Sequence, residues 1–266
     1  MPVDQVQYTR IPAFVPGLVE HAWVARHDGT TREILLPDGR GLLQVILGEG
    51  GTLVAVATGT ELPDATGVRG LMTRPVVRIA RGAGVRLGLQ LHPSALASLG
   101  VATLVDTWAD VDTLVGSAAL AAAALEAGED GQAVGILVDE LRSRRQADDA
   151  ETVQVRELLS LIDERDGAIT VPELARAAEV TVSDVHRWAV RHLGLPPADY
   201  LSAVRFSVFV RRAVGPGVVE PEAVLRALRW YARAGYPPRE VERTAGMSPV
   251  ELQRVDERIG ALLDHP

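Results

Sequence analysis

The chain has 266 residues, of which 47% are hydrophobic and 23% charged, as in globular proteins of one or two domains. It contains no cysteine, which excludes disulfides and thiolate metal sites, and its formal net charge is −8. No apolar run approaches the ~20 residues of a membrane-spanning helix, and the first residues lack the basic and apolar regions of a secretion signal. We therefore expect a cytoplasmic protein with no membrane partner.

The region from about residue 14 to about residue 91 has the pattern of β-strands. Short runs rich in Val, Ile and Leu, such as LLQVILG, are separated by turn sequences such as PDGRG. Strands of this length at regular spacing predict an antiparallel barrel or sandwich. The sequence HPSALASLG then predicts a short helix. We assign residues 1–115 to a β-rich sensor domain.

The remainder of the chain has the pattern of helices. Residues 116–150, including the alanine-rich SAALAAAALEAG, form a predicted helical linker. The linker sequence AVGILVDELRSRR is a candidate for joining two subunits, but its apolar face could equally pack on the β-rich domain. Residues 151–266 form a predicted helical domain. The expected fold class is therefore α+β, with an antiparallel β part followed by an all-α part.

One stretch of the helical part, ELARAAEVTVSDVHRWAV, predicts two short helices joined by a tight turn. Thr170 and Glu173 form a Thr-x-x-Glu capping box, and Pro172 lies in the first turn, where its missing N–H is harmless. Thr181 and Asp184 form a second capping arrangement at the start of the next helix. Such a pair is either an ordinary helical corner or a helix-turn-helix that presents its second helix to DNA.

The second helix of this pair separates apolar from polar side chains. At 100° per residue, one face carries Val185, Trp188, Ala189 and His192. The opposite face carries Ser183, His186, Arg187 and Val190, with Arg191 at its edge. An apolar back and a front of hydrogen-bonding groups are what a recognition helix requires.

Charge along the chain is uneven. All 27 basic residues are arginine. Between Val185 and Arg239 the sequence contains nine arginines and three acidic residues, which gives this segment a formal charge of +6. A charge run of this kind is most simply a solvated face, but here it begins inside the helix pair. The overall acidity alone would argue against nucleic acid as a partner.

From this point the chain resembles the DNA-binding domain of the AraC/XylS family of bacterial transcription regulators. The resemblance covers roughly residues 168–254. It rests on ELARAAEVTVSDVHRW, on Gly194, Pro197, Tyr200 and Arg205 within GLPPADYLSAVRF, and on the later ARAGY and GMSPVELQR. It implies two helix-turn-helix units joined by a long helix, with double-stranded DNA as the partner. It also places Ser183, His186 and Arg187 at base-contacting positions and Arg191 at a phosphate.

The front half supports the same interpretation. GLVEHAW, EILLPDGRGLLQVILG and VRLGLQLHPSALASLGV are similar to an uncharacterised β domain found ahead of AraC-type domains, and to cupin-like sensor domains whose barrel holds an effector. The LPDG sequence by itself is most simply a hairpin turn. Trp23 is a candidate for stacking on a ligand, although a tryptophan in the core is the simpler interpretation. We expect a cavity lined mainly by apolar side chains with a few polar groups. The candidate partners are a small-molecule effector and a second copy of the chain.

The second unit departs from the family pattern. The family expects a recognition helix between GY and the later G-x-S-P, where this chain has only PPREVERT. The chain's own repeat suggests another alignment, in which EVERTAGMSPVELQRV matches ELARAAEVTVSDVHRW at a constant offset of 67 residues. The matched pairs are Glu173/Glu240, Arg176/Arg243, Ala178/Ala245, Thr181/Ser248, Asp184/Glu251 and Arg187/Arg254.

The repeat predicts helices over about Arg239–Ala245 and Pro249–Leu262, because Pro237 and Pro238 end the preceding helix and Gly246 suits a C-terminal cap. Candidate DNA contacts of this unit are Arg239, Arg243, Gln253 and Arg254. The later helix also carries the acids Glu251, Asp256 and Glu257, which repel phosphates. We therefore expect the first unit to supply most of the base readout.

The sequence offers little for enzyme chemistry. The β-rich part has only His21, His27 and His92, without a His-x-His pair, so we expect no metal site. No Gly-x-Ser-x-Gly, phosphate-binding loop or dinucleotide fingerprint is present, and we expect neither a catalytic residue nor a cofactor. The alternative function is a protein-interaction or ligand-binding module that has lost DNA affinity through its degenerate second unit.

Overall fold

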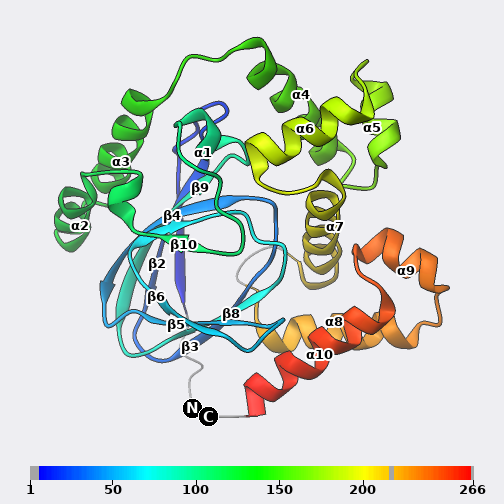
Figure 1. Cartoon of the computed structure of the whole chain (residues 1–266). Helices are drawn as coiled ribbons and strands as arrows, with labels where there is room; N and C mark the ends of the chain where they lie inside the picture. The colour runs from blue at the N-terminus through cyan, green and yellow to red at the C-terminus, as the bar shows by residue number, and fades with distance from the viewer. Residues whose placement is uncertain (1–5, 216–218, 265–266) are drawn as a thin grey trace.

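The computed structural model describes residues 6–215 and 219–264, and it places the strands first and the helices after them (Figure 1). This order confirms the predicted α+β class. The strands are β1 (Gln7–Ile11), β2 (Val19–His27), β3 (Thr31–Leu35), β4 (Gly41–Gly48), β5 (Gly51–Ala55), β6 (Glu61–Asp64), β7 (Gly67–Arg69), β8 (Val76–Ala80), β9 (Gly84–Leu91) and β10 (Trp108–Ala109).

The strands form a β sandwich of two antiparallel sheets. One sheet has the order β1-β2-β9-β4-β7-β10 and the other β3-β8-β5-β6. Their inner faces meet, because Gln44 of β4 donates to Asp64 of β6 at 2.9 Å and Arg86 of β9 donates to Glu33 of β3 at 2.7 Å. Strands β3 and β4 lie in different sheets, so the LPDG turn between them is a crossover, and its interpretation as a hairpin is wrong.

Helices cover the outer face of the larger sheet. They are α1 (Ala95–Ser98), α2 (Ala118–Glu126) and α3 (Asp130–Arg144), with a 3₁₀ turn at Val111–Thr113. Because side chains alternate along a strand, Leu43 and Val45 of β4 point outward and share one apolar core with Ala121 and Leu137 of the helices. The apolar face of α3 therefore packs on the sandwich, the second of its two predicted roles.

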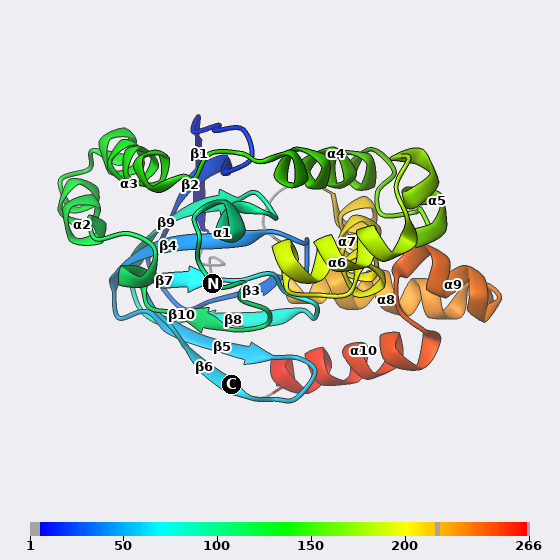
Figure 2. The same cartoon turned by 45° about the horizontal axis from the view of Figure 1, so that its top comes forward.

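The second half of the chain contains seven further helices within the described residues. They are α4 (Ala150–Glu164), α5 (Val171–Ala177), α6 (Val182–Leu193), α7 (Pro197–Val214), α8 (Pro221–Arg233), α9 (Pro238–Ala245) and α10 (Pro249–Asp264). The long α7 packs against both α6 and α9 and so connects two helix pairs, α5–α6 and α9–α10 (Figures 1 and 2). The bounds of α9 and α10 confirm the alignment from the internal repeat.

The later helices also pack on the sandwich. Ile34 and Val77 of the smaller sheet belong to one apolar cluster with Phe206 of α7, Leu228 of α8 and Ile259 of α10. Helices therefore pack on the outer face of each of the two sheets. Among the residues described, no helix combines the length and the apolar character needed to cross a membrane.

Candidate nucleic-acid interface and ligand cavity

The pair α5–α6 has the predicted caps at both helix starts. The Thr170 N–H donates to Glu173 Oε2 at 2.9 Å, and the Glu173 N–H donates to Thr170 Oγ1 at 3.4 Å. At α6 the Thr181 N–H donates to Asp184 Oδ2 at 3.3 Å, and the return bond measures 3.1 Å. The bond from the Thr181 hydroxyl is the main cause of the lowered pKa of Asp184. Both helix starts are therefore fixed by side chains of their own sequence.

The back of α6 is buried as its sequence predicts. Val185, Trp188, Ala189 and His192 are all buried, and the first three belong to a core shared with α4, α5 and α7. His192 Nε2 lies 3.0 Å from Oε1 of Glu151 on α4. These contacts hold α6 rigidly against its neighbours.

The front of α6 is open to solvent. Ser183, His186 and Arg187 are exposed, and 59% of the Arg187 side chain is accessible. Its guanidinium lies 2.6 Å from Asp184, one turn earlier on the same helix. Arg191 is exposed at the edge of this face and donates to Glu151 at 3.1 Å. The structure thus brings the four predicted side chains of this unit onto one accessible surface.

The pair α9–α10 repeats this construction with a different surface. Ser248 and Glu251 cap α10, with N–H···O distances of 3.0 and 3.3 Å, and the backbone bond from Ser248 is the main cause of the lowered pKa of Glu251. Arg239 and Arg243 are exposed on α9. On α10, Arg254 is exposed.

Other side chains of α10 are engaged elsewhere. Gln253 donates to Glu257 at 2.8 Å on the same helix. Arg258 donates to the Val56 carbonyl of the sandwich at 3.1 Å, and Glu251 pairs with Arg74 at 3.4 Å. The second unit therefore contacts the β sandwich through α10, its candidate recognition helix.

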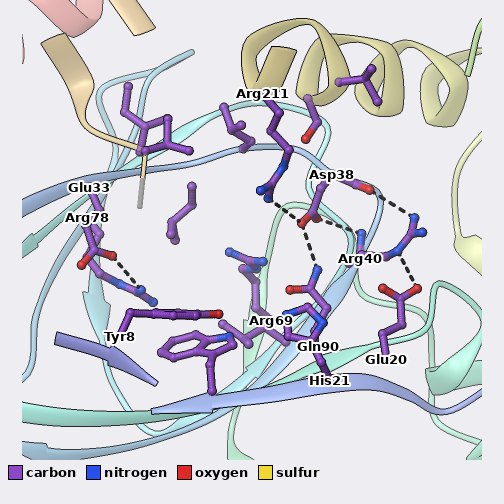
Figure 3. A pocket seen from close by; sticks show the side chains of 18 of the residues that line it. Tyr8, Glu20, His21, Glu33, Asp38, Arg40, Arg69, Arg78, Gln90 and Arg211 are labelled. Atoms are coloured by element: carbon purple, nitrogen blue, oxygen red, sulfur yellow. Dashed lines mark hydrogen bonds and ion pairs between the residues drawn. The ribbon is translucent and has the colours of Figure 1, made fainter. Parts of the chain in front are cut away.

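A cavity of about 630 Å³ lies between the inner faces of the sandwich and helix α7. Figure 3 shows side chains that line it. Its charged lining residues are Arg10, Glu20, Glu33, Asp38, Arg40, Arg69, Arg78, Asp163, Asp166 and Arg211.

This lining departs from the expectation of apolar side chains with only a few polar groups, because ten of the lining residues are charged. The apolar residues Val68 of β7 and Leu89 of β9 face the covering helices, so the next positions, Arg69 and Gln90, face the cavity.

The crossover turn supplies part of the cavity rim. Asp38 accepts from Gln90 Nε2 at 2.9 Å, and Arg40 lies 2.7 Å from Glu20 and 2.6 Å from Asp163 of α4 (Figure 3). Burial raises the pKa of Glu20 and opposes the effect of Arg40. Sequence reasoning missed this set, because the turn chemistry of PDGRG explained the same residues more simply.

Trp23 does line the cavity. Its ring stacks on Tyr8 with centroids 5.6 Å apart, and it lies so close to Gly88 that a Cβ there would be 2.3 Å from the indole. Glycine at this position lets the indole lie flat on strand β9. Within residues 6–215 and 219–264, no group of three or more His, Asp or Glu side chains could hold a metal ion.

No family model matches the sequence, and no curated relative matches it. Among solved structures, the chain is similar to ToxT from Vibrio cholerae, with a TM-score of 0.40 and 8% identity over 89% of this chain and 92% of that one. It is also similar to CuxR, described as an AraC-like transcriptional activator, with a TM-score of 0.33 and 12% identity over 68% of this chain and 73% of that one.

A further neighbour is ToxT from Vibrio cholerae with a bound unsaturated fatty acid, with a TM-score of 0.37 and 8% identity over 97% of this chain and 93% of that one. All of these likenesses are distant, so the function of this chain must be inferred from its own residues.

Proposed function

We propose that the chain is a cytoplasmic transcription regulator that binds double-stranded DNA sequence-specifically and reads bases mainly through helix α6. The observation that carries this proposal is the exposed front of α6, where Ser183, His186 and Arg187 lie above a buried back. Helix-turn-helix proteins contact base edges with residues from the N-terminal part of the recognition helix. All three side chains lie in the first half of α6.

The chemistry of this front suits the major groove. An arginine can donate two hydrogen bonds to O6 and N7 of guanine, and a serine hydroxyl can donate or accept. The rigid mount of α6 on α4 and α7 means that little conformational entropy is lost when these groups meet DNA. Arg187 must exchange its contact with Asp184 for one with a base. Because this ion pair is exposed, breaking it costs little free energy.

The test of this proposal is a selection of bound sequences from random DNA duplexes with the full chain. We expect a recurring sequence to be enriched, with an affinity that falls steeply as salt rises, because phosphate contacts release counterions. A duplex of the same composition in scrambled order is the control. Equal retention of both duplexes would refute sequence-specific binding.

The second candidate function is a module that works through protein or ligand contacts without DNA. The observation that favours it is the fastening of α10 to the β sandwich by Arg258 and Glu251. Under this alternative no duplex would be retained at low salt. Any retention that decreases with rising salt would exclude it.

For the β sandwich we propose a sensor role, in which a small effector binds in the cavity. Its volume of about 630 Å³ lies within the range of small-molecule sites, roughly 300–1,000 Å³. The lining includes Ser207, Val208 and Arg211 of α7, the helix that packs against both helix pairs. An occupant would therefore touch the element that connects the two helix pairs.

A further inference from the structure

Arg69 is a buried cation that faces the cavity. It lies on β7 in register with Leu42 of β4 and Trp108 of β10, whereas its neighbour Val68 faces the covering helices. Only 5% of the residue is exposed, and it belongs to the cavity lining. Figure 3 shows its side chain among the labelled lining residues, with no dashed line reaching it.

The other buried arginines of the sandwich have carboxylate partners. Arg78 Nε lies 2.8 Å from Asp64, and Arg86 lies 2.7 Å from Glu33. Arg40 at the rim has two, Glu20 and Asp163. These acids therefore neutralise Arg78, Arg86 and Arg40.

Arg69 itself has no hydrogen bond and no ion pair with any described residue. Its Nε is buried without an acceptor, and its guanidinium carbon lies over the Trp108 ring, 6.0 Å from the ring centroid. Burial lowers the pKa of Arg69 to about 10, so it still carries its charge at neutral pH. Asp38 and Asp64 act on this charge only from a distance. A buried charge without a directly paired carboxylate is costly, and a cavity beside it gives an anion room to supply that partner.

We propose that the cavity binds a small monocarboxylate whose carboxylate pairs with Arg69 and whose apolar body lies against Trp23 and Leu42. The planar guanidinium presents two parallel donors that match a carboxylate. A single negative charge fits because Arg69 is the deeply buried cation of this lining that lacks a partner among the described residues. Leu42 and Trp23 belong to one small apolar cluster on the inner face.

This inference deepens the proposed function, on which its regulatory meaning rests. The same cavity is the proposed effector site, and the carboxylate class now follows from Arg69. Binding of the acid is measured without DNA, so failure of either proposal can be seen separately.

The experiment measures binding of octanoate and 3-phenylpropanoate to the full chain by calorimetry, with the primary amide of each acid as the uncharged control. We expect at least one acid to bind at least tenfold more tightly than its amide. Arg69→Met should abolish this difference. Arg81→Met, which removes an exposed arginine outside the cavity, should leave it unchanged.

A second measurement separates a binding role from a structural one. Replacing an unpaired buried cation with an apolar side chain of similar length should raise the melting temperature of the ligand-free chain by about 2–4 °C. If Arg69→Met does not fold, Arg69→Gln removes the charge and keeps a donor, and the same loss of preference for the acid is expected.

Three results would overturn the inference. They are no binding of either acid at up to about 1 mM, equal binding of both acids and their amides, and an unchanged preference for the acid in the Arg69 variant.

Discussion

The two helix-turn-helix pairs have the same local construction but different surroundings. Each begins its second helix with a hydroxyl residue and an acid three positions later, Thr181 with Asp184 and Ser248 with Glu251. The front of α6 faces solvent, whereas α10 donates from Arg258 to the sandwich. At the offset of 67 residues Arg258 corresponds to Arg191, which donates to Glu151 of α4. The same sequence signature therefore builds two capped helices that differ in which part of the molecule this edge arginine contacts.

The electrostatics of the two helices differ in the same sense. Asp184, the acid nearest the front of α6, pairs with Arg187 and caps the helix. Helix α10 carries Glu257 exposed, with Asp256 paired to Arg229 at 2.9 Å. Exposed negative charge near a groove repels phosphates, so we expect α10 to contribute less than α6 to the proposed DNA binding.

The largest expected effect on stability concerns the buried side chains that hold α6 and α10 against their neighbours. Trp188 of α6 corresponds to Val255 of α10 at the offset of 67 residues, and both are buried. Trp188→Ala should lower the free energy of unfolding by roughly 3–5 kcal/mol, because it leaves a large cavity. Val255→Ala should cost about 2 kcal/mol, because fewer methyl groups are removed.

Unfolding in urea, followed by circular dichroism, measures both losses. Trp188→Phe is the control and should cost less than about 1.5 kcal/mol, because the buried indole N–H has no partner to lose. Equal losses of unfolding free energy in the two alanine variants would mean that Trp188 and Val255 contribute equally to the packing of their helices.

The next largest effect is expected at the turns of the two pairs, whose backbone conformations are occupied by different residues. Gly246 has φ +69°, and a Cβ there would lie 2.2 Å from the Ser202 carbonyl oxygen. Gly246→Ala should therefore cost about 1–2 kcal/mol for the left-handed backbone, with the clash in addition. The corresponding residue of the first pair is Glu179, which is exposed with φ 55°.

Glu179→Gly should act in the opposite direction and raise the free energy of unfolding by about 0.5–1 kcal/mol, because it relieves that backbone. The pair of variants is again compared by urea unfolding. A loss of stability in Glu179→Gly would show that its side chain contributes more than its backbone costs.

The smallest difference is expected at the caps. Thr181→Ala and Ser248→Ala should each cost about 1 kcal/mol, because each removes one helix cap. Hydrogen bonds lower the pKa values of Asp184 and Glu251 in the folded chain. Their stabilising effect is therefore complete above the unfolded pKa values, about 4, and is lost as the pH falls through the lower folded values.

Melting temperatures of the two variants and the parent between about pH 3 and 6 measure this dependence. Each variant should lose less stability than the parent chain as the pH falls. Parallel curves for all three proteins would contradict the assigned role of these carboxylates.

Local sequence signals predicted the helix pairs well. The caps at Thr170 and Thr181, the buried face with Trp188, and the position of α10 after Pro249 all follow from short-range chemistry that the tertiary structure leaves intact. The internal repeat placed the second unit correctly where the family pattern did not, because it compares the chain with itself.

The cavity could not be predicted in the same way. Its character depends on which face of β7 and β9 the covering helices pack against, and this leaves Arg69 and Gln90 facing the cavity. Arg69 is one arginine among 27 in the sequence, and its lack of a partner is visible only in three dimensions. The crossover at Asp38 was likewise hidden by an ordinary turn sequence.

The most direct test of the central claim compares the two reading helices on the duplex selected by the native chain. Arg187→Ala should weaken binding by about 10- to 100-fold, since a bidentate arginine–guanine contact contributes ~1–3 kcal/mol of discrimination, and should leave thermal stability unchanged. The double changes Gln253→Ala with Arg254→Ala, and Arg239→Ala with Arg243→Ala, should each weaken binding by less than about threefold. If either double variant loses sequence-specific binding as fully as Arg187→Ala, the second unit reads DNA and the account is contradicted.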